Sequence, residues 1–481
     1  MRMSNHDRDW EGVMSETLFF FGIDAANRQL AYEPMPLDKV AEVAKDKGDR
    51  DALGDQAKRQ LELENAKDSL GLPASVKDPN DLAQTGWAIA WGESITDEIK
   101  GALEPLIAFR KAQMGGKHDQ LFKELAIKKT DTLQDLRVRW KFSPGVVDPK
   151  KVPAYVMIVG APTDVSFDLQ QKLDVDLFVG RLDLQTPEQY AAYAKAVIAN
   201  EKTAARPKKA VFWGPQHPND GATALSVPNL VTPLAQYVAE RKIVEVTEAV
   251  ADQATKSALA TAMGDDVPGL LFTGGHGALL PSFKTDDERT LQREIQGALV
   301  TQEWPNDPDD FGPMPAEQLF AASDVNGSLD GLVAIFFACF GAGTPQKSRY
   351  PHVPGIKDLA PVEFTARLPQ AMLGKGAAAV IGHVERTWDT GFSWDGIGEP
   401  QLETWKSVID TVLDGNRVGR AVAYLNERYS SIAAELSMGL LDEQNNGVIL
   451  EKRRRAYLFT QNEDARSWIV LGDPAAKLSM V

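Results

Sequence analysis

The chain has 481 residues, of which 43% are hydrophobic and 25% are charged, a balance typical of a folded globular protein rather than a disordered one. Its formal net charge of -16 at pH 7 argues against binding to nucleic acid or to an anionic membrane, because both attract basic surfaces. The single cysteine, Cys339, excludes an internal disulfide and a structural zinc site built from several cysteines.

Residues 1–150 are polar and rich in lysine and aspartate, and we interpret them as a mainly helical N-terminal region with a regulatory role. Within them, 37–66 carries many charges and few apolar residues, as a solvated arm or a surface helix does. Only 18–23 and 87–91 have the composition of buried segments. The N-terminus lacks the apolar segment of a signal peptide, and its apolar run is too short to cross a bilayer, so we expect a cytoplasmic protein.

From Pro153 onward, short apolar runs alternate with amphipathic helices, and each run ends at a glycine or a turn. The runs are Tyr155–Gly160, Leu177–Gly180, Ala210–Gly214, Ile243–Val246, Gly269–Thr273, Leu332–Ala338, Ala377–Gly382 and Trp468–Gly472. This alternation predicts an α/β fold in which mostly parallel strands are covered by helices on both faces. We expect a first α/β subdomain at 151–263 and a second one, carrying the chemistry, at 264–481.

Two of these runs end in residues that can perform chemistry. The run that begins at Gly269 leads into Gly-Gly-His276-Gly277, and the run that begins at Leu332 leads into Ala-Cys339-Phe-Gly. Ligands of open α/β sheets bind beyond the carboxyl ends of the strands. We therefore expect the imidazole of His276 and the thiol of Cys339 to lie at one edge of the sheet.

A neighbouring imidazole is what a cysteine nucleophile needs, because a free thiol with a pKa near ~8.5 is mostly protonated at neutral pH. The backbone N–H groups of Gly277 and Cys339 are the expected donors to the oxyanion of a tetrahedral intermediate. The alternative is that Cys339 is a small buried hydrophobe. No second histidine lies near either residue in sequence, so we predict neither a metal site nor a cofactor.

An apolar strand followed by His-Gly, and a second followed by Ala-Cys, resembles the signature of the clan CD cysteine peptidases, which include caspases, metacaspases, clostripain, separase and gingipains. The closest resemblance is to gingipains and bacterial caspase-like proteins. It rests on Leu177–Leu182 with the helix after Thr186, on Gly376–Ile381 with Arg386–Trp388, and on the final Gly472-Asp-Pro. The resemblance covers about residues 153–481.

The resemblance implies a caspase-like fold, with an open, mostly parallel sheet between helices, in two subdomains. It implies a cysteine endopeptidase in which His276 and Cys339 are the catalytic pair. In arginine-specific gingipains an aspartate and a tryptophan line the primary specificity pocket, and Asp164 and Trp388 stand at the matching positions. A carboxylate and an indole suit a guanidinium, so the resemblance implies cleavage after arginine or lysine. Rival carboxylates are Asp174, Asp176 and Asp389, and Arg181 is interpreted as structural rather than as a pocket for aspartate.

A peptidase of this kind needs latency, and two basic stretches invite cleavage by an enzyme that prefers arginine or lysine. Lys347 and Arg349 follow the cysteine, and Arg455 lies in a run of arginines. The alternative is a pair of solvated basic loops. The expected partners are protein or peptide substrates and an activating protein or protease. Two other functions stay open: a catalytically silent scaffold of the same fold, and a cysteine amidohydrolase that acts on a small molecule.

Overall fold

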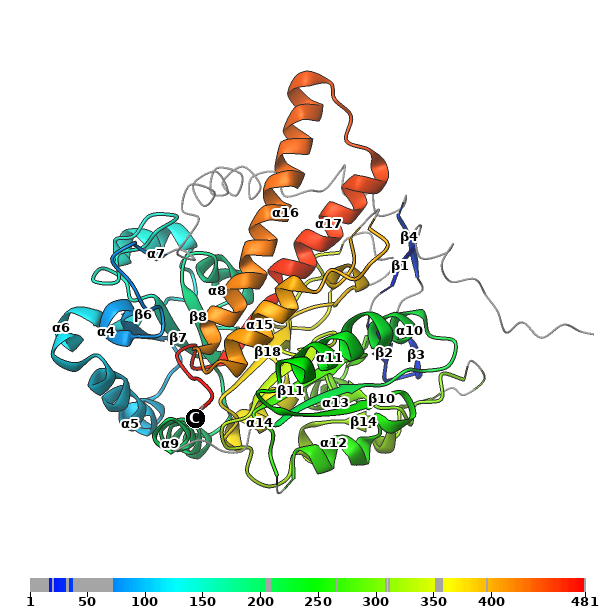
Figure 1. Cartoon of the computed structure of the whole chain (residues 1–481), viewed down its shortest axis with the longest axis horizontal. Helices are drawn as coiled ribbons and strands as arrows, with labels where there is room; N and C mark the ends of the chain where they lie inside the picture. Colours follow the sequence, from blue (N-terminus) through cyan, green and yellow to red (C-terminus); the bar gives the residue numbers. More distant parts are fainter. Residues whose placement is uncertain are drawn as a thin grey trace, which may run out of the picture.

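A ten-stranded sheet forms the centre of the part of the chain that the structure describes (Figure 1). The computed structural model describes residues 17–19, 21–31, 34–37, 72–203, 209–264, 266–307, 309, 312–350, 358–394 and 397–479. The strands follow one another across the sheet as β10 (Glu245–Val250), β9 (Lys209–Gly214), β11 (Leu270–Gly274), β15 (Val333–Phe337), β18 (Ala379–His383), β19 (Trp468–Gly472), β8 (Phe178–Leu182), β7 (Tyr155–Val159), β5 (Trp87–Trp91) and β6 (Phe122–Ala126). The fold is therefore the mixed α/β architecture that the sequence predicts.

The direction of the strands reverses once, in the middle of this sheet. β18 and β19 are antiparallel, with Ala379 opposite Gly472 and His383 opposite Trp468. The other neighbouring pairs of the sheet are parallel. The carboxyl ends of β9, β11, β15 and β18 therefore meet at one edge of the sheet, and those of β5, β7, β8 and β19 meet at the opposite edge.

All eight apolar runs of the sequence form strands of this sheet. Each of these strands except β10 is buried along nearly its whole length, which explains why its sequence is continuously apolar. The region predicted to be mainly helical supplies two further strands, β5 and β6, in addition to helices such as α5 (Asp97–Gln113) and α7 (Leu133–Trp140). β6 is the last strand of the sheet and is mostly half-exposed, so its sequence Phe-Lys-Glu-Leu-Ala has no apolar run. The boundaries at 150/151 and 263/264 stay predictions, and the sheet continues across both.

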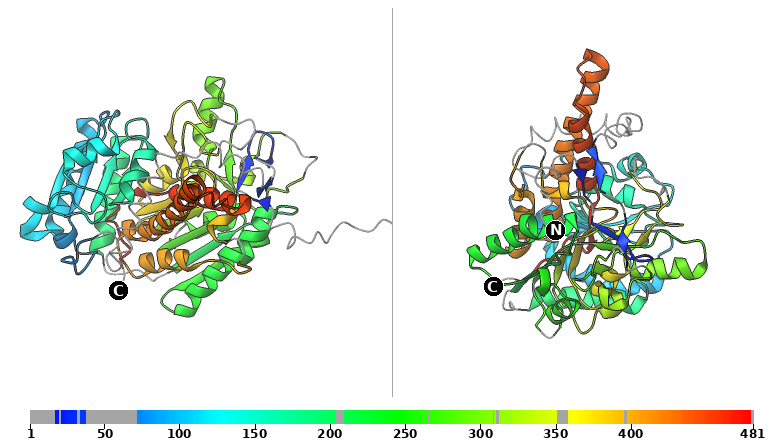
Figure 2. Two further views of the ribbon diagram at one scale, coloured as in Figure 1. Left: turned by 90° about the horizontal axis from the view of Figure 1, so that it is seen from above. Right: turned by 90° about the vertical axis from the view of Figure 1, so that its right-hand side faces the viewer.

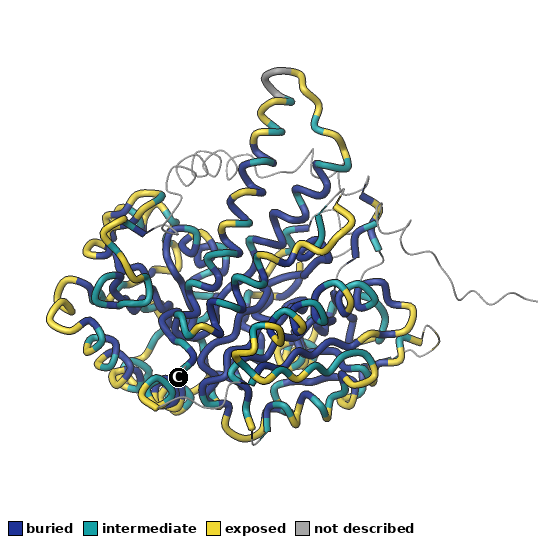
Figure 3. The backbone as a smooth tube through the Cα atoms, viewed as in Figure 1, coloured by how far each residue is buried: buried dark blue, intermediate teal, exposed yellow. Residues whose placement is uncertain are grey.

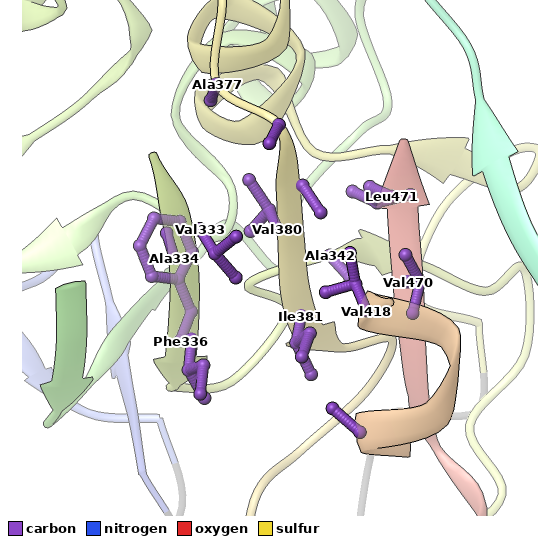
Figure 4. Close-up of a cluster of buried hydrophobic side chains, with 14 of the residues drawn as sticks. Val333, Ala334, Phe336, Ala342, Ala377, Val380, Ile381, Val418, Val470 and Leu471 are labelled. Atoms are coloured by element: carbon purple, nitrogen blue, oxygen red, sulfur yellow. The ribbon is translucent and has the colours of Figure 1, made fainter. Parts of the chain in front are cut away.

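Helices cover the two faces of the sheet. On one face α5 packs against α9 (Pro187–Lys202), which packs against α14 (Arg367–Gly374). On the other face α11 (Thr232–Arg241), α15 (Glu403–Leu413) and α16 (Val418–Asn446) follow one another. Figure 4 shows part of the core between these layers, where most of the labelled side chains come from β15, β18, β19 and the start of α16, and Ala342 and Ala377 lie just outside these elements. Within this core β11 and β15 pair in parallel, which places their carboxyl ends side by side.

A second, five-stranded sheet lies beyond the carboxyl ends of β11 and β15. Its order is β14 (Leu319–Phe320), β13 (Leu299–Val300), β12 (Gly277–Leu279), β2 (Gly22–Asp24) and β3 (Gln29–Leu30). β2 pairs in parallel with β12, so that Gly22 lies opposite Gly277. An N-terminal segment is thus built into the structure directly beside His276.

The hairpin of α16 and α17 (Lys452–Arg466) projects from the body of the molecule (Figures 1 and 2). Its base is buried and its tip is exposed, as Figure 3 shows by colour. No helix in the described ranges is long and apolar enough to cross a membrane.

Candidate active site

His276 lies between β11 and β12, at the edge of the sheet where the carboxyl ends of β9, β11, β15 and β18 meet. Its side chain is fully buried, and its Nε2 lies 2.8 Å from Oδ2 of Asp220. Because an ionised carboxylate can only accept a hydrogen bond, Nε2 carries the ring proton, which leaves the lone pair on Nδ1. Nδ1 has no hydrogen-bond partner in the described structure. The imidazole is therefore oriented by one nitrogen and free to act through the other.

Asp220 is the N-cap residue of α10 (Gly221–Ser226), six residues beyond the end of β9. Its carboxylate accepts from the backbone N–H groups of Ala222 and Thr223 and from the Thr223 hydroxyl. Burial by itself would raise the pKa of Asp220, but the neighbouring imidazole of His276 and these hydrogen bonds outweigh it and lower the pKa. Asp220 is thus a buried carboxylate that stays ionised beside His276.

His217 is a second imidazole in the same cluster. Its Nε2 donates to the Thr301 carbonyl at 3.0 Å, and its ring lies 5.9 Å from the His276 ring, centroid to centroid. Burial lowers the pKa of His217 to about 4, so this histidine is neutral at pH 7. Trp304 stands edge-on to both rings. No second histidine lies near His276 in the sequence, but the loop that follows β9 folds back and brings His217 beside it.

His217, Asp220 and His276 offer three ligand atoms that all lie within 4.8 Å of one another. Two imidazoles and a carboxylate are a ligand set that zinc accepts. The prediction of no metal site assumed that no second histidine approaches His276, and folding brings one there. In the hydrogen-bonded arrangement of this structure, however, Asp220 orients His276 directly.

Cys339 lies two residues beyond the end of β15, and its sulfur accepts a hydrogen bond from the backbone N–H of Thr387 at 3.3 Å. The side chain is fully buried, and burial raises the pKa of the thiol to about 12. The next residue, Phe340, has a φ of 58°, a left-handed conformation that is uncommon for a bulky side chain. The chain therefore turns sharply just after the thiol, as strained backbone often does at functional sites.

The structure brings His276 and Cys339 together at the ends of two adjacent strands. β11 and β15 pair in parallel, and the N–H of Gly275 donates to the Phe337 carbonyl at 3.1 Å. Gly277 is packed so closely against Cys339 that an added Cβ would overlap the carbonyl oxygen of Cys339. No hydrogen bond joins the His276 ring to the sulfur in this arrangement.

The two predicted oxyanion donors point at one oxygen. The N–H groups of Cys339 and Gly277 both donate to the carbonyl of Phe21, at 3.2 and 3.5 Å. Phe21 belongs to the N-terminal segment and was not expected at the site. A peptide carbonyl thus sits where backbone donors from both strand ends converge.

The structure does not bring Asp164 to this place. Asp164 follows β7, whose carboxyl end lies at the opposite edge of the sheet, and its carboxylate accepts from the backbone N–H and the hydroxyl of Ser94. Two of the rival carboxylates belong to the same half: Asp174 accepts from the N–H of Val179, and Asp176 faces Arg137. The reversal between β18 and β19 separates Asp164 from the Cys339 edge, whereas Asp174 and Asp176 precede β8 and lie at the amino end of that strand, three strands away from β15.

Asp389 and Trp388 do lie beside the site, in the stretch that follows β18. The N–H of Asp389 donates to the Phe19 carbonyl at 3.2 Å, and burial raises the pKa of this carboxyl to about 7. The Trp388 ring is fully buried against Tyr350 and Leu18. In this arrangement Trp388 lies beside the site as a buried hydrophobic residue, with its ring packed against other side chains.

The remaining basic candidates have partners within the fold. The guanidinium of Arg181 is buried and donates to the carbonyl of Gly160 and to Gln170, which fits the structural role expected of it. Arg349 donates to Gln171, and Arg455 is buried in α17 and pairs with Glu443. Lys347 is exposed. Self-processing at these residues stays a prediction, and only Lys347 is openly accessible.

No protein-family model matches the sequence, and no curated protein sequence is similar to it. The Arg-specific cysteine proteinase gingipain R is similar in structure over 82% of this chain and 78% of its own, with 11% identity and a TM-score of 0.42. The complex of RgpB pro- and mature domains from Porphyromonas gingivalis is similar over 82% and 80%, with 10% identity and a TM-score of 0.40. The Saccharomyces cerevisiae separase–securin complex is similar over 66% of this chain and 15% of the separase chain, with 9% identity and a TM-score of 0.29. Gingipain and separase are two of the proteins that the sequence motifs resemble, and at these identities the likeness is one of fold.

The sequence contained a usable signal for Asp220. β9 is the neighbour of β11, so residues that follow β9 lie at the same edge as His276, as His217 and Asp220 do. Inspecting every strand end for a carboxylate would have found Asp220. No comparable signal pointed to Phe21, because its position depends on a pairing between β2 and β12 that are distant in sequence.

Proposed function

We propose that this protein is a cysteine endopeptidase of caspase-like fold in which Cys339 is the nucleophile and His276 is the general acid and base. One observation carries the proposal: the N–H groups of Gly277 and Cys339 converge on a peptide carbonyl oxygen beside the thiol. This is the arrangement that stabilises the oxyanion of an acyl-transfer intermediate.

In the proposed reaction, Nδ1 of His276 takes the proton from the thiol of Cys339, and the sulfur attacks the peptide carbonyl carbon. The carbonyl π electrons move to oxygen, which the two N–H groups stabilise. When the intermediate collapses, the C–N bond breaks and the imidazolium gives its proton to the departing amine. Water, deprotonated by His276, then hydrolyses the thioester and releases the acid and the thiol.

Asp220 acts in this scheme as a positioning residue. Its hydrogen bond to Nε2 keeps the lone pair on Nδ1, and its negative charge stabilises the imidazolium that forms during the reaction. The lowered pKa of Asp220 means that this charge persists at low pH. The buried, neutral His217 fills the space behind His276 without competing for the proton.

Latency is supported by the state of the thiol. Cys339 is fully buried, and its raised pKa disfavours the thiolate while Phe21 and Gly22 cover it. An activating protein or protease would have to remove this cover. Cleavage after arginine or lysine stays a prediction of the sequence, and Asp164, on which it mainly rested, lies at the other edge of the sheet.

The same burial favours a second candidate, a catalytically silent scaffold whose thiol never becomes accessible. The backbone hydrogen bonds of Phe21 to Thr387 and of Asp389 to Phe19 speak for a peptide groove rather than for a small-molecule pocket. The deciding experiment incubates the full chain with a library of peptides and identifies the cleaved bonds by mass spectrometry, beside Cys339→Ala. Cleavage that Cys339→Ala abolishes supports the peptidase, and cleavage that persists in this variant assigns the activity to a contaminant.

A further inference from the structure

The N-terminal segment lies across the site in the manner of a bound peptide. The N–H of Phe21 donates to the Thr387 carbonyl at 3.1 Å, and the Phe19 carbonyl accepts from Asp389 at 3.2 Å. These two bonds alternate along the segment as an antiparallel strand pair does. Beyond Phe21, β2 continues in parallel pairing with β12. The segment is thus held on both sides of Cys339 by backbone hydrogen bonds that do not depend on its sequence.

The bond presented to the thiol is the one between Phe21 and Gly22. The carbonyl oxygen of Phe21 is the shared acceptor of the two N–H donors, and a Cβ built on Gly22 would lie 3.4 Å from the sulfur. In the proposed reaction, Phe21 would become the acyl group on sulfur and Gly22 the departing amine. The segment therefore identifies which residue of a substrate enters the primary specificity pocket.

That pocket is aromatic. The ring of Phe21 lies 5.3 Å from that of Phe337, 6.4 Å from that of Phe392 and 5.8 Å from that of His276, and the residue is fully buried. Edge-to-face pairs of this kind stabilise an aromatic guest beyond the burial of its surface. A guanidinium in the same place would lose its hydration and be surrounded by aromatic rings, which is unfavourable for a charged group without a partner.

Two buried acidic groups in and beside the stretch after β18 do not change this conclusion. Asp464 accepts from the Trp388 N–H, and one of its oxygens lies 3.8 Å from the guanidinium of Arg428. Burial raises the pKa values of Asp464 and Asp389 to about 7, so neither is a strong anion in this environment. Neither supplies the exposed carboxylate fork that holds an arginine.

Phe19 marks a second subsite, two residues before Phe21. A Cβ added to Gly221 would lie 2.6 Å from the Phe19 ring, so this ring packs closely against the backbone at the start of α10. Gly221 follows Asp220 directly, which places the subsite beside the His276 partner. The segment thus offers Phe19, Phe21 and Gly22 to the groove.

We propose that Phe19, Phe21 and Gly22 occupy the peptide-binding groove of their own chain, and that the groove selects peptides with an aromatic residue before the cleaved bond. The inference rests on the proposed function for the cleavage, and on backbone hydrogen bonds and packing for the occupancy. A competing peptide can bind only after the segment is cut after Phe21 or leaves the groove. The preference differs from the basic one that the sequence resemblance implies.

Occupancy is tested by the rate at which iodoacetamide alkylates Cys339 in the native full-length chain. Cys339 is the only cysteine, so the added mass reports on it unambiguously. The variant Phe19→Asp/Phe21→Asp should expel the segment and raise the rate at least about tenfold, since burying each phenyl ring contributes that much to occupancy. Phe109→Asp, on the half-buried face of α5, is the matched control. Equal rates in the three proteins would overturn the occupancy.

Selectivity is tested in the expelled variant with two peptidyl fluoromethyl ketones that differ only in carrying phenylalanine or arginine next to the ketone. Labelling of Cys339 should be about 10–100-fold faster with phenylalanine. Faster labelling with arginine would overturn the aromatic pocket and restore the basic preference. Labelling by neither, while iodoacetamide still reacts faster than in the wild type, would overturn the peptidase and the substrate preference and leave the occupancy standing. Should the double variant not fold by circular dichroism, Phe21→Ala takes its place in both assays.

Discussion

The half of the sheet formed by β9, β11, β15 and β18 and the half formed by β5, β6, β7 and β8 are both parallel, but they run in opposite directions. Polar residues follow the strands in both halves. In the β5–β8 half their hydrogen bonds are made within that half. The Ser94 hydroxyl donates to the Asp164 carboxylate, and the Arg181 guanidinium donates to the Gly160 carbonyl. In the other half Nδ1 of His276 has no partner, and the N–H groups of Gly277 and Cys339 are bonded by a segment from elsewhere in the chain. Polar groups at a strand end therefore indicate a reactive site only where the local structure leaves them available.

The difference between the two halves of the sheet can be tested by removing one polar group from each half. Cys339→Ala should lower the rate of peptide cleavage by about 10⁴-fold or more, because no other group can form the acyl-enzyme. Asp164→Asn, in the other half, should change the rate by less than about twofold, since its partners are local. Steady-state rates with a peptide containing phenylalanine measure both. A large loss in Asp164→Asn would show that the two edges of the sheet cooperate.

Asp220 tests whether its carboxylate serves the reaction or only caps α10. Asp220→Asn keeps the shape and removes the charge, and we expect kcat to fall by roughly 10²–10⁴-fold while KM changes little, because the imidazolium loses its counter-ion. The acidic limb of the pH profile of kcat should also move to lower pH, because an imidazolium without its counter-ion loses its proton more readily. Stopped assays from pH 5 to 9 measure this. A variant that loses stability but keeps kcat and its profile would reduce Asp220 to a capping residue.

Gly277 tests the backbone donors. A Cβ at this position would overlap the Cys339 carbonyl oxygen, so Gly277→Ala must shift one of the two strand ends and misplace a donor. Losing one such donor lowers rates by roughly 10²–10³-fold. Gly101→Ala on α5, where nothing lies within 4 Å of the added Cβ, is the matched control and should stabilise the helix by about 1 kcal/mol. Unchanged activity in Gly277→Ala would exclude its N–H from the reaction.

The smallest effect concerns stability in the β5–β8 half. Burial raises the pKa of Asp174 to about 7, so between about pH 4 and 7 the folded state keeps a proton that the unfolded state has released. The stability that this group contributes is complete below about pH 4 and is lost as the pH rises to 7. Asp174→Asn should therefore gain roughly 2–4 kcal/mol relative to wild type between pH 4 and pH 8. Urea unfolding at both pH values measures it, and a pH-independent difference contradicts the buried-carboxyl interpretation.

The strands of the fold were predictable wherever a buried strand leaves a continuous apolar run. Tyr155–Val159 and Trp468–Gly472 are examples, since both faces of each strand are covered. β6 was missed because an edge strand needs few apolar residues, and its Lys123 and Glu124 could equally belong to a helix. The antiparallel pairing of β18 with β19 could not be predicted either, because the sequence of a strand does not indicate the direction of its neighbour in the sheet.

The sequence by itself determined that a histidine and a cysteine stand at the ends of two apolar strands, flanked by glycines, because strand composition and turn chemistry are local properties. Only the tertiary structure decided that Asp220 and His217 join them, that Asp164 lies at the far edge, and that Phe21 fills the space between the donors. Those outcomes follow from pairings such as β2 with β12 and β18 with β19, whose partners are remote in the chain. Backbone hydrogen bonds form in the same way whatever the side chains are. The packing of side chains throughout the core therefore determines which strands pair.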